Sequence, residues 1–410
     1  MPEKKTLDQT LVRESNLSST LRLIHNEAPL SRAQLATRTG LNKSTVSSLI
    51  EELLDRKLIH ETGMSSVGTG RPATMLEINP QAGCIIGVEF GVDFVSVGLA
   101  NFVGQVLWRQ VGVADPAEAQ DTTLAQALEL VSAAIVAARS ESQQILGLGL
   151  ALPGMVDLDK GVLIFAPYLN WHDVPMRHIF SERTGLKIFV ENDANAAAVA
   201  ENLFGVARQS RDFVFVYAGV GIGGGIFLNG RLYRGKGSCA GEIGRSPIMS
   251  GSFQASESDH RGLWETYANQ NSVIQRVKAR LDPGRSSLVQ GLVLEPNAPF
   301  SISAIEQAAD GGDEIALEAL AETGVAMGQG FATLVNFLNP EKIILGGPLS
   351  IVGKYLLPSL KKTVNQYSLP EIGQQVEVVV SEFGLDASLI GAIAIVVEDV
   401  LTHPALLERR

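Results

Sequence analysis

The 410-residue chain lacks the features on which disulfide-built and membrane-spanning proteins depend. It contains only two cysteines, Cys84 and Cys239, which are too few for a disulfide framework or a cysteine-built zinc site. No stretch approaches the roughly 18 uninterrupted apolar residues of a membrane span, and the first residues contain no apolar signal segment. We therefore expect a soluble cytoplasmic protein with no membrane partner, in which both cysteines are small buried residues.

The chain is rich in apolar residues, and its charge is unevenly distributed. Apolar residues make up 45% and charged residues 19%, which supports well-buried cores and, at this length, two or three domains. Residues 1–80 contain ten Lys and Arg against nine Asp and Glu, so the net charge of −11 arises in the remainder of the chain. A near-neutral head on an acidic body is typical of a protein with a small DNA-binding head.

Apolar residues recur at helical spacing in three stretches, which begin near residues 15, 31 and 42. Ser31 and Gln34 form a capping-box pattern at the start of the second stretch, and Gly40 is a natural end for it. Asn42 can cap the third helix. The apolar stripe of that helix consists of Val46, Leu49, Ile50, Leu53 and Leu54. The pattern predicts two short helices joined by a tight turn, after a first helix.

This arrangement favours a helix-turn-helix, because the third helix presents small polar side chains and a lysine from its first turns. Such side chains let a helix approach the major-groove floor while its N–H groups meet phosphates. The predicted DNA contacts are Arg32, Asn42, Lys43, Ser44, Thr45, Ser47 and Ser48. The alternative is an ordinary amphipathic three-helix bundle with a polar face, and the pattern alone leaves both open.

The segment after the third helix predicts two short β-segments around a Gly/Ser-rich tip, which would form a wing beside the helices. Arg71 lies in this tip between Gly70 and Pro72. An extended arginine in that position can enter a narrow A·T-rich minor groove, and we predict it as a DNA contact. The alternative interpretation of Arg71 is a solvated turn residue.

From about residue 81 the sequence alternates between β-branched or Gly-rich runs and helical stretches, which predicts an α/β body in two related lobes. Residues 387–400 predict a buried apolar helix. Four stretches of the chain together resemble the ROK family (repressors, open reading frames, kinases), and most closely its xylose-repressor type. These stretches are SRAQLATRTGLNKSTVSSLIEELL with GTGRPA, LALPGMVD, ENDANAAAVAE, and GVGIGGGIFLNGRLYRGKGSCAGEIG followed by WETYAN.

The resemblance implies an N-terminal winged helix-turn-helix followed by an actin/hexokinase-like body with a sugar in the cleft between its lobes. We divide the chain into a DNA-binding domain at 1–80, a first lobe at 81–200, and a second lobe at 201–385 that also provides an oligomerisation surface. The C-terminal helix at 386–410 is expected to return to the first lobe.

The same resemblance implies a set of sugar-binding residues. They are Asn170, Asn192, Asp193, Glu242, Arg245 and Glu265. Asp193 matches the catalytic base of the family kinases, yet a carboxylate there can equally hold a sugar hydroxyl, and we favour this second role. Arg245 stands where the family has a sugar-contacting histidine. It can pair with Glu242 or Glu265, or it can recruit an anionic ligand.

Both phosphate-binding loops depart from the kinase pattern. Val92 and Phe94 replace small and hydroxyl-bearing residues in the first loop, and Val220 replaces a threonine in the second. We therefore predict no catalytic residue and no enzyme activity. The family's structural zinc is also predicted absent, because the positions of its four ligands read Arg245, Ser256, Ser258 and Leu263, and no other cofactor is expected.

The leading hypothesis is a sugar-responsive transcriptional regulator, a repressor of carbohydrate (xylose-like) utilisation genes that binds operator DNA as a homodimer or homotetramer. Lobe closure around a sugar would change the placement of the DNA-binding heads. One alternative is a ROK sugar kinase that phosphorylates a hexose with ATP and carries a DNA-binding head. Another is a repressor that responds to a protein partner and to no small ligand.

Overall fold

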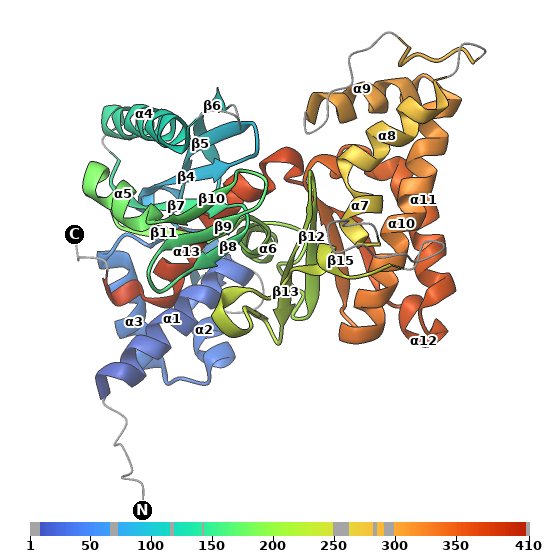
Figure 1. The fold of residues 1–410 in the computed structure, drawn as a ribbon. Coiled ribbons are helices and arrows are strands. Elements are labelled where there is room, and N and C mark those ends of the chain that lie inside the picture. The colour runs from blue at the N-terminus through green and yellow to red at the C-terminus, as the bar shows by residue number, and fades with distance from the viewer. Residues whose placement is uncertain are drawn as a thin grey trace, which may run out of the picture.

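The computed structural model describes residues 9–65, 73–114, 119–141, 143–248, 262–281, 285–290 and 299–406. They form an N-terminal head below a body of two lobes, each built around a five-stranded sheet (Figure 1). The mixed helix and sheet architecture confirms the predicted fold class.

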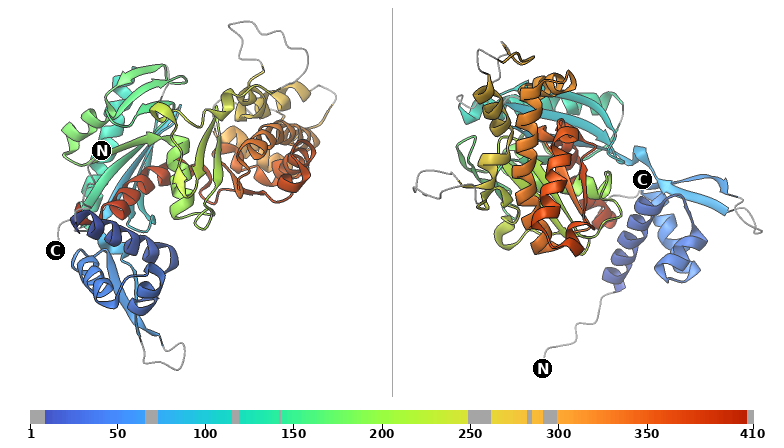
Figure 2. Two further views of the ribbon diagram at one scale, coloured as in Figure 1. Left: turned by 90° about the horizontal axis from the view of Figure 1, so that it is seen from below. Right: turned by 90° about the vertical axis from the view of Figure 1, so that its right-hand side faces the viewer.

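The head contains three helices and a small sheet in the order β1-β3-β2. Its elements are α1 (Gln9–Glu27), β1 (Leu30–Ser31), α2 (Arg32–Thr39), α3 (Lys43–Asp55), β2 (Ile59–Ser65) and β3 (Ala73–Ile78). The Ser31 and Gln34 side chains form the predicted capping box, and Gly40 ends α2 in the left-handed conformation. The antiparallel hairpin of β2 and β3 extends away from the body as the predicted wing (Figure 2). Arg71, which lies between β2 and β3 in the sequence, is outside the described residues.

The first lobe has a sheet in the order β11-β7-β4-β5-β6. Its strands are β4 (Cys84–Phe90), β5 (Phe94–Asn101), β6 (Val106–Val113), β7 (Ile145–Leu152) and β11 (Ile188–Asn192). Helices α4 (Gln120–Ser140) and α5 (Met176–Thr184) pack on the sheet, and a second small sheet contains β8 (Met155–Asp157), β9 (Val162–Ala166) and β10 (Trp171–Val174). Trp171 is buried against the ring of Phe90, so it is a core residue.

The second lobe has a sheet in the order β14-β13-β12-β15-β16. Its strands are β12 (Phe213–Ala218), β13 (Ile222–Leu228), β14 (Arg231–Leu232), β15 (Lys342–Gly346) and β16 (Glu377–Val380). Its helices are α7 (Trp264–Ala268), α8 (Gln270–Arg280), α9 (Pro299–Asp310), α10 (Glu314–Leu338), α11 (Gly353–Tyr367) and α12 (Pro370–Gly373). Three short 3-10 turns lie near the site, η3 (Ile243–Arg245), η4 (Pro348–Ser350) and η5 (Gly384–Asp386), and a further one, η6 (Pro404–Leu406), follows α13 and contacts α1 of the head.

Two helices pack closely between the sheets, α6 (Asp193–Leu203) and α13 (Ala387–Thr402). Small residues make this approach possible, because a Cβ atom on Gly391 would collide with the backbone of Ala196 and Ala197. The alanine-rich sequence of α6 therefore has a packing reason. Helix α13 also lies against β4 and β7 of the first sheet.

Helix α4 is the one described helix whose length and apolar composition would suffice to cross a membrane. Its apolar face, which includes Leu124, Ala127 and Val131, is buried against strands β5 and β6. This packing explains the apolar composition as that of a core helix. Cys84 is buried as expected, whereas Cys239 is only half-buried, so the expectation that both cysteines are core residues was wrong for Cys239.

Candidate functional site

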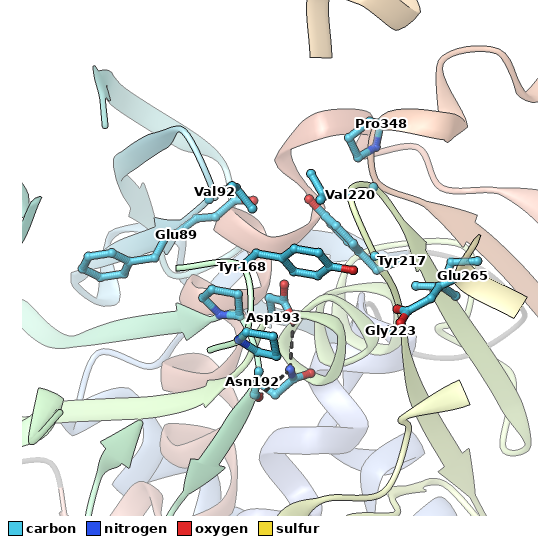
Figure 3. Close-up of a pocket in the computed structure, with 18 of the residues that line it drawn as sticks. Glu89, Val92, Tyr168, Asn192, Asp193, Tyr217, Val220, Gly223, Glu265 and Pro348 are labelled. Atoms are coloured by element: carbon cyan, nitrogen blue, oxygen red, sulfur yellow. Dashed lines mark hydrogen bonds between the residues drawn. The ribbon is translucent and has the colours of Figure 1, made fainter. Parts of the chain in front are cut away.

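A cavity of about 540 Å³ lies between the two lobes, and Figure 3 shows the side chains that line it. Both five-stranded sheets contribute to it through the ends of their strands and the loops that follow. The polar residues that line it are Glu89, Asp93, Tyr168, Asn192, Asp193, Tyr217, Glu242, Arg245, Glu265 and Gln270. Five of the six residues predicted to bind the sugar are in this lining, and Asn170 is not.

Asn192 and Asp193 lie where β11 ends and α6 begins. The Asn192 side chain caps α6 by accepting from the Asn195 N–H at 3.1 Å, and its amide donates to the Gly154 carbonyl at 3.1 Å and to Asp193 at 2.9 Å. The Asp193 carboxylate also accepts from the Ala194 N–H at 2.8 Å. Strand, cap and helix thus fix the direction in which the carboxylate faces the cavity.

Burial raises the pKa of Asp193 to about 6, and the nearby Glu242 carboxylate adds to this effect, while the hydrogen bond from Ala194 opposes it. Burial also raises the pKa of Glu242. Two carboxyls held close together in a partly dry cavity have a strong requirement for hydrogen-bond donors. Hydroxyl groups of a ligand could supply them.

The second lobe presents Glu242, Arg245 and Glu265 from η3 and the first turn of α7. The Arg245 guanidinium lies 3.6 Å from the Glu265 carboxylate, so the structure forms one of the two ion pairs that the sequence suggested. The Glu265 side chain is 15% exposed and that of Arg245 is 54% exposed. Glu265 is therefore the more enclosed partner, and Arg245 lies nearer to solvent.

Tyr168 occupies the place in the cavity that the sequence analysis assigned to Asn170. Asn170 is exposed in a turn with φ of 53°, away from the lining, whereas the Tyr168 ring reaches across the cleft toward Gly221 and Glu265 (Figure 3). A Cβ atom on Gly221 would lie only 3.0 Å from the Tyr168 ring. The signal was present in the sequence, since Pro167-Tyr168-Leu169 stands at the family's Pro-Asn-Leu pattern.

Glu89 is a further residue of the cavity that the sequence analysis did not select. It is 2% exposed, one of its carboxylate oxygens has no partner, and its strand β4 packs on the first turns of α13, where the Leu389 carbonyl lies beside Gly87. Burial raises the pKa of Glu89 to about 8, with Asp193 and Asp386 adding to the effect. The wall of the cavity is thereby joined to the start of α13.

An ion pair between the lobes lies beside the cavity. The buried Glu191 carboxylate, at the end of β11, accepts from Nε and Nη2 of Arg234 at 3.0 and 2.8 Å. Arg234 follows β14 in the second lobe. This contact connects the two lobes directly next to Asn192.

On the head, the predicted DNA contacts gather at the start of α3. Asn42 caps the helix by accepting from the Thr45 N–H at 2.8 Å, and the Ser44 hydroxyl donates to Asn42 at 2.7 Å. Lys43, Ser44 and Ser48 are exposed, while Thr45 and Ser47 are half-buried. Arg32, at the start of α2, is exposed and lies 3.3 Å from Glu61 of the wing.

The head is bonded to the body through α1 and α13. Arg22 donates to both carboxylate oxygens of Glu398 at 3.0 and 2.6 Å and to the Thr402 hydroxyl at 2.5 Å. The Ser18 hydroxyl donates to the Leu401 carbonyl at 2.8 Å, and Arg208 donates to the His25 carbonyl at 3.0 Å. Bidentate pairing of this kind fixes orientation as well as contact.

The zinc site of the family does not fit the residues that the structure describes. Arg245 and Leu263 offer no zinc ligand atom, and Ser256 and Ser258 lie outside the described residues. Within the described ranges, no group of three or more His, Cys, Asp and Glu side chains could hold a metal ion.

Comparisons with known proteins agree with this architecture. The ROK family model matches residues 85–399, and the MarR family model matches residues 18–68. A xylose repressor from Caldicellulosiruptor bescii is 31% identical over 97% of this chain and 99% of its own length.

Among solved structures, a ROK family transcriptional regulator homologous to Escherichia coli Mlc has a TM-score of 0.80 at 27% identity, over 96% of this chain and 97% of its own. A ROK family glucokinase from Streptomyces griseus, in complex with glucose and AMPPNP, has a TM-score of 0.65 at 28% identity over 76% of this chain and 99% of its own. The glucokinase therefore aligns with a part of the chain, whereas the transcriptional regulator aligns with nearly all of it. From the extent of these matches, the chain belongs to the ROK family.

Proposed function

We propose that this chain is a repressor of carbohydrate-utilisation genes that binds operator DNA through its head and responds to a sugar in the cavity between its lobes. The proposal is supported chiefly by one observation. A single helix, α13, connects a cavity suited to a polyol with a winged helix-turn-helix. Its relative from Caldicellulosiruptor bescii is named a xylose repressor, so pentoses are the first ligands to examine. Operator DNA places such a protein in the cytoplasm.

We assign the sugar hydroxyls to Asp193, Glu242 and Glu265 and to the remaining lone pair of the Asn192 side-chain oxygen, since the Asn192 amide protons are already donated within the protein. Each hydroxyl can donate and accept, so a ring of carboxylates and one amide can satisfy several adjacent hydroxyls at once. Asp193 holds its hydroxyl as a hydrogen-bond acceptor. Arg245 neutralises Glu265 and leaves its outer donors for the ligand or for water.

We assign the DNA contacts to the exposed start of α3, with Lys43 on a phosphate and Ser44, Thr45 and Ser47 near base edges. Asn42 is engaged in the helix cap, so its amide positions α3. Arg32 and Ser48 flank this surface, and Arg71 stays a proposal for the minor groove. A homodimer or homotetramer would place two heads on successive operator half-sites.

The route from cavity to DNA is helix α13. Its first turns pack on β4, the strand that carries Glu89 of the cavity wall, and its last turns hold α1 of the head through Glu398, Leu401 and Thr402. Helix α6, which begins at Asp193, packs along α13. Closure of the lobes on a sugar would move α6 and α13 relative to the second lobe and thereby reorient the head.

The test is operator binding by the full chain with and without pentoses, hexoses and their glycosides. A sugar that occupies the cavity should change operator affinity by the ratio of its affinities for the DNA-bound and free arrangements. If no sugar changes operator affinity and none raises the thermal unfolding midpoint, the sensing part of the proposal fails. DNA binding that survives deletion of residues 1–80 would overturn the assignment of the head.

The domain boundaries of the proposal need one adjustment. Helix α6 continues to Leu203, past the expected limit of the first lobe at residue 200. We therefore place the limit between Leu203 and Phe213, where β12 of the second lobe begins.

The chain is proposed as a non-enzyme, because Val92 and Val220 leave the two loops without phosphate-binding side chains. A phosphorylation assay with ATP and a panel of sugars tests this. Phosphorylation by the unaltered protein that is lost in Asp193→Asn would contradict the proposal.

A further inference from the structure

We propose that the part of the cavity above Tyr168, on the side of the altered phosphate loops, binds an uncharged apolar substituent carried by the sugar, so that the effector is a glycoside with an apolar aglycone. This inference rests on the proposed function, since it concerns the ligand of the same cavity. It assigns a use to a compartment that a free monosaccharide would leave empty.

The position of Tyr168 divides the cavity. In Figure 3 its ring lies between Asn192 and Asp193 on one side and Val92, Val220 and Pro348 on the other. A cavity of about 540 Å³ is in the size range that suits drug-sized ligands, larger than a single pentose or hexose. A sugar hydrogen-bonded to Asp193 would therefore leave the compartment beyond Tyr168 for a substituent.

The upper compartment has an apolar part beside the carboxyl groups of Glu89 and Asp93. This apolar part is formed by Val92, Val220 and Pro348, with the Tyr168 ring as its floor. Val220 and Val92 are half-buried, so their methyl groups are available to a ligand. An apolar ring bound among them would be transferred from water to an apolar surface. This transfer is favourable and drives such binding.

The first N–H group of the second loop is not free for a phosphate in the present arrangement. The Gly219 N–H donates to the Gly221 carbonyl at 3.0 Å, so the loop closes on itself. The start of α8 fixes it further, because the Gln270 N–H donates to the Gly219 carbonyl at 2.9 Å and Asn269 donates to the Val220 carbonyl at 2.7 Å. The backbone is held rigidly and presents a valine side chain.

The charge of the cavity also opposes a phosphate group. Glu89 and Asp93 lie on the side of the altered loops, and of the described lining residues only Arg245 is a cation. Arg245 is already paired with Glu265, whose carboxylate lies 3.6 Å away. A phosphorylated sugar or a nucleotide would thus bring its negative charge into a cavity whose one described cation, Arg245, is already paired with Glu265. An uncharged substituent avoids this cost.

The test compares matched glycosides on the full-length protein by isothermal titration calorimetry. Methyl and phenyl β-D-xylopyranoside form one pair, methyl and phenyl β-D-glucopyranoside a second, and glucose 6-phosphate and Mg²⁺–AMPPNP are the charged probes. We expect the phenyl member of the preferred pair to bind on the order of tenfold more tightly than the methyl member, and neither charged probe to bind.

The variant Val220→Asp adds a carboxylate to the upper compartment and should abolish the phenyl preference, which is read as the ratio of the two affinities. Val92→Asp is the second variant in case the first does not fold. Val136→Asp is the matched control, because Val136 is 66% exposed on α4, and it should leave the ratio unchanged.

The outcomes separate this inference from the proposed function. Equal affinity for the methyl and phenyl members, or tight binding of either charged probe, overturns the apolar compartment while sugar sensing stands. A phenyl preference that persists in both aspartate variants also overturns it. If none of the sugars or glycosides binds, the proposed function fails and this inference fails with it.

Discussion

The start of α3 in the head and the cavity in the body use polar side chains in opposite ways. On α3, Lys43 and Ser44 are exposed, and the helix cap fixes their position. In the cavity, Glu89 is buried and Asp193 is half-buried, and removal from water raises the pKa of each carboxyl. Exposed groups cost little to maintain and suit a large charged partner, whereas buried carboxyls are costly unless a ligand supplies donors. The head is prepared for DNA and the cavity for a small, hydroxyl-rich molecule.

The largest expected effect comes from removing the central acceptor of the cavity. Asp193→Asn keeps the shape but exchanges a carboxylate for an amide with one acceptor, so sugar affinity should fall roughly a hundredfold through two lost charge-assisted hydrogen bonds. Titration calorimetry measures this with the best sugar of the panel. Operator affinity without sugar is the control and should stay unchanged, and sugar binding within threefold of the unaltered protein would contradict the assigned role.

The pH dependence of sugar binding should follow the same carboxyl. A hydroxyl that donates to Asp193 favours the ionised form, so binding must release a proton below the pKa of about 6. Affinity should therefore decrease as the pH falls through 6, by about tenfold between pH 7.5 and pH 5. Calorimetry in matched buffers at both pH values checks this. A flat profile in the unaltered protein would refute the link to Asp193.

That pKa also predicts the stability of the protein without sugar. Because folding raises the pKa of Asp193, the folded state retains a proton that the unfolded chain loses, so this residue's contribution to stability decreases as the pH rises from about 4 to 6. In Asp193→Asn this decrease should be absent. Thermal unfolding midpoints of the two proteins across this range provide the comparison.

A smaller effect is expected at the exposed surface of the head. Lys43→Ala removes one phosphate contact, so operator affinity should fall about fivefold at moderate salt, and the slope of log affinity against log salt should decrease by about one. Gel-shift titrations at several salt concentrations measure both quantities. Lys361→Ala is the matched control, since Lys361 is an exposed lysine on α11. An unchanged salt slope in Lys43→Ala would place the DNA surface elsewhere.

The smallest effect concerns the contact between the two regions. Arg22→Glu places two carboxylates together at α1 and α13, so the ratio of operator affinities without and with sugar should move about threefold toward one. The double variant Arg22→Glu with Glu398→Arg should restore the ratio. Arg285→Glu reverses a comparable exposed pair with Glu318 in the second lobe and should leave it unchanged. If coupling is intact in the single variant, α13 is not the route.

The turn before β10 shows where a sequence pattern loses its precision. The pattern identified the segment but selected Asn170, whereas the structure turns Tyr168 into the cavity and Asn170 toward solvent. In a strand or helix the spacing of residues tells which side chains share a face, but a turn with a positive φ at Asn170 follows no such period. The residue that enters a cavity from a turn depends on what it meets across the cleft, and here it meets Gly221.

The sequence by itself determined the local elements of this protein. Three of these elements depend on neighbours in the chain, and the structure has each as predicted. They are the capping box at Ser31, the cap at Asn42 and the buried apolar helix over residues 387–400. The tertiary structure alone decided that Glu89 meets the start of α13 and that Arg22 meets its end. Arg22 and Glu398 are 376 positions apart, and no local periodicity encodes a pairing over that distance, because it exists only once both lobes and the head have packed.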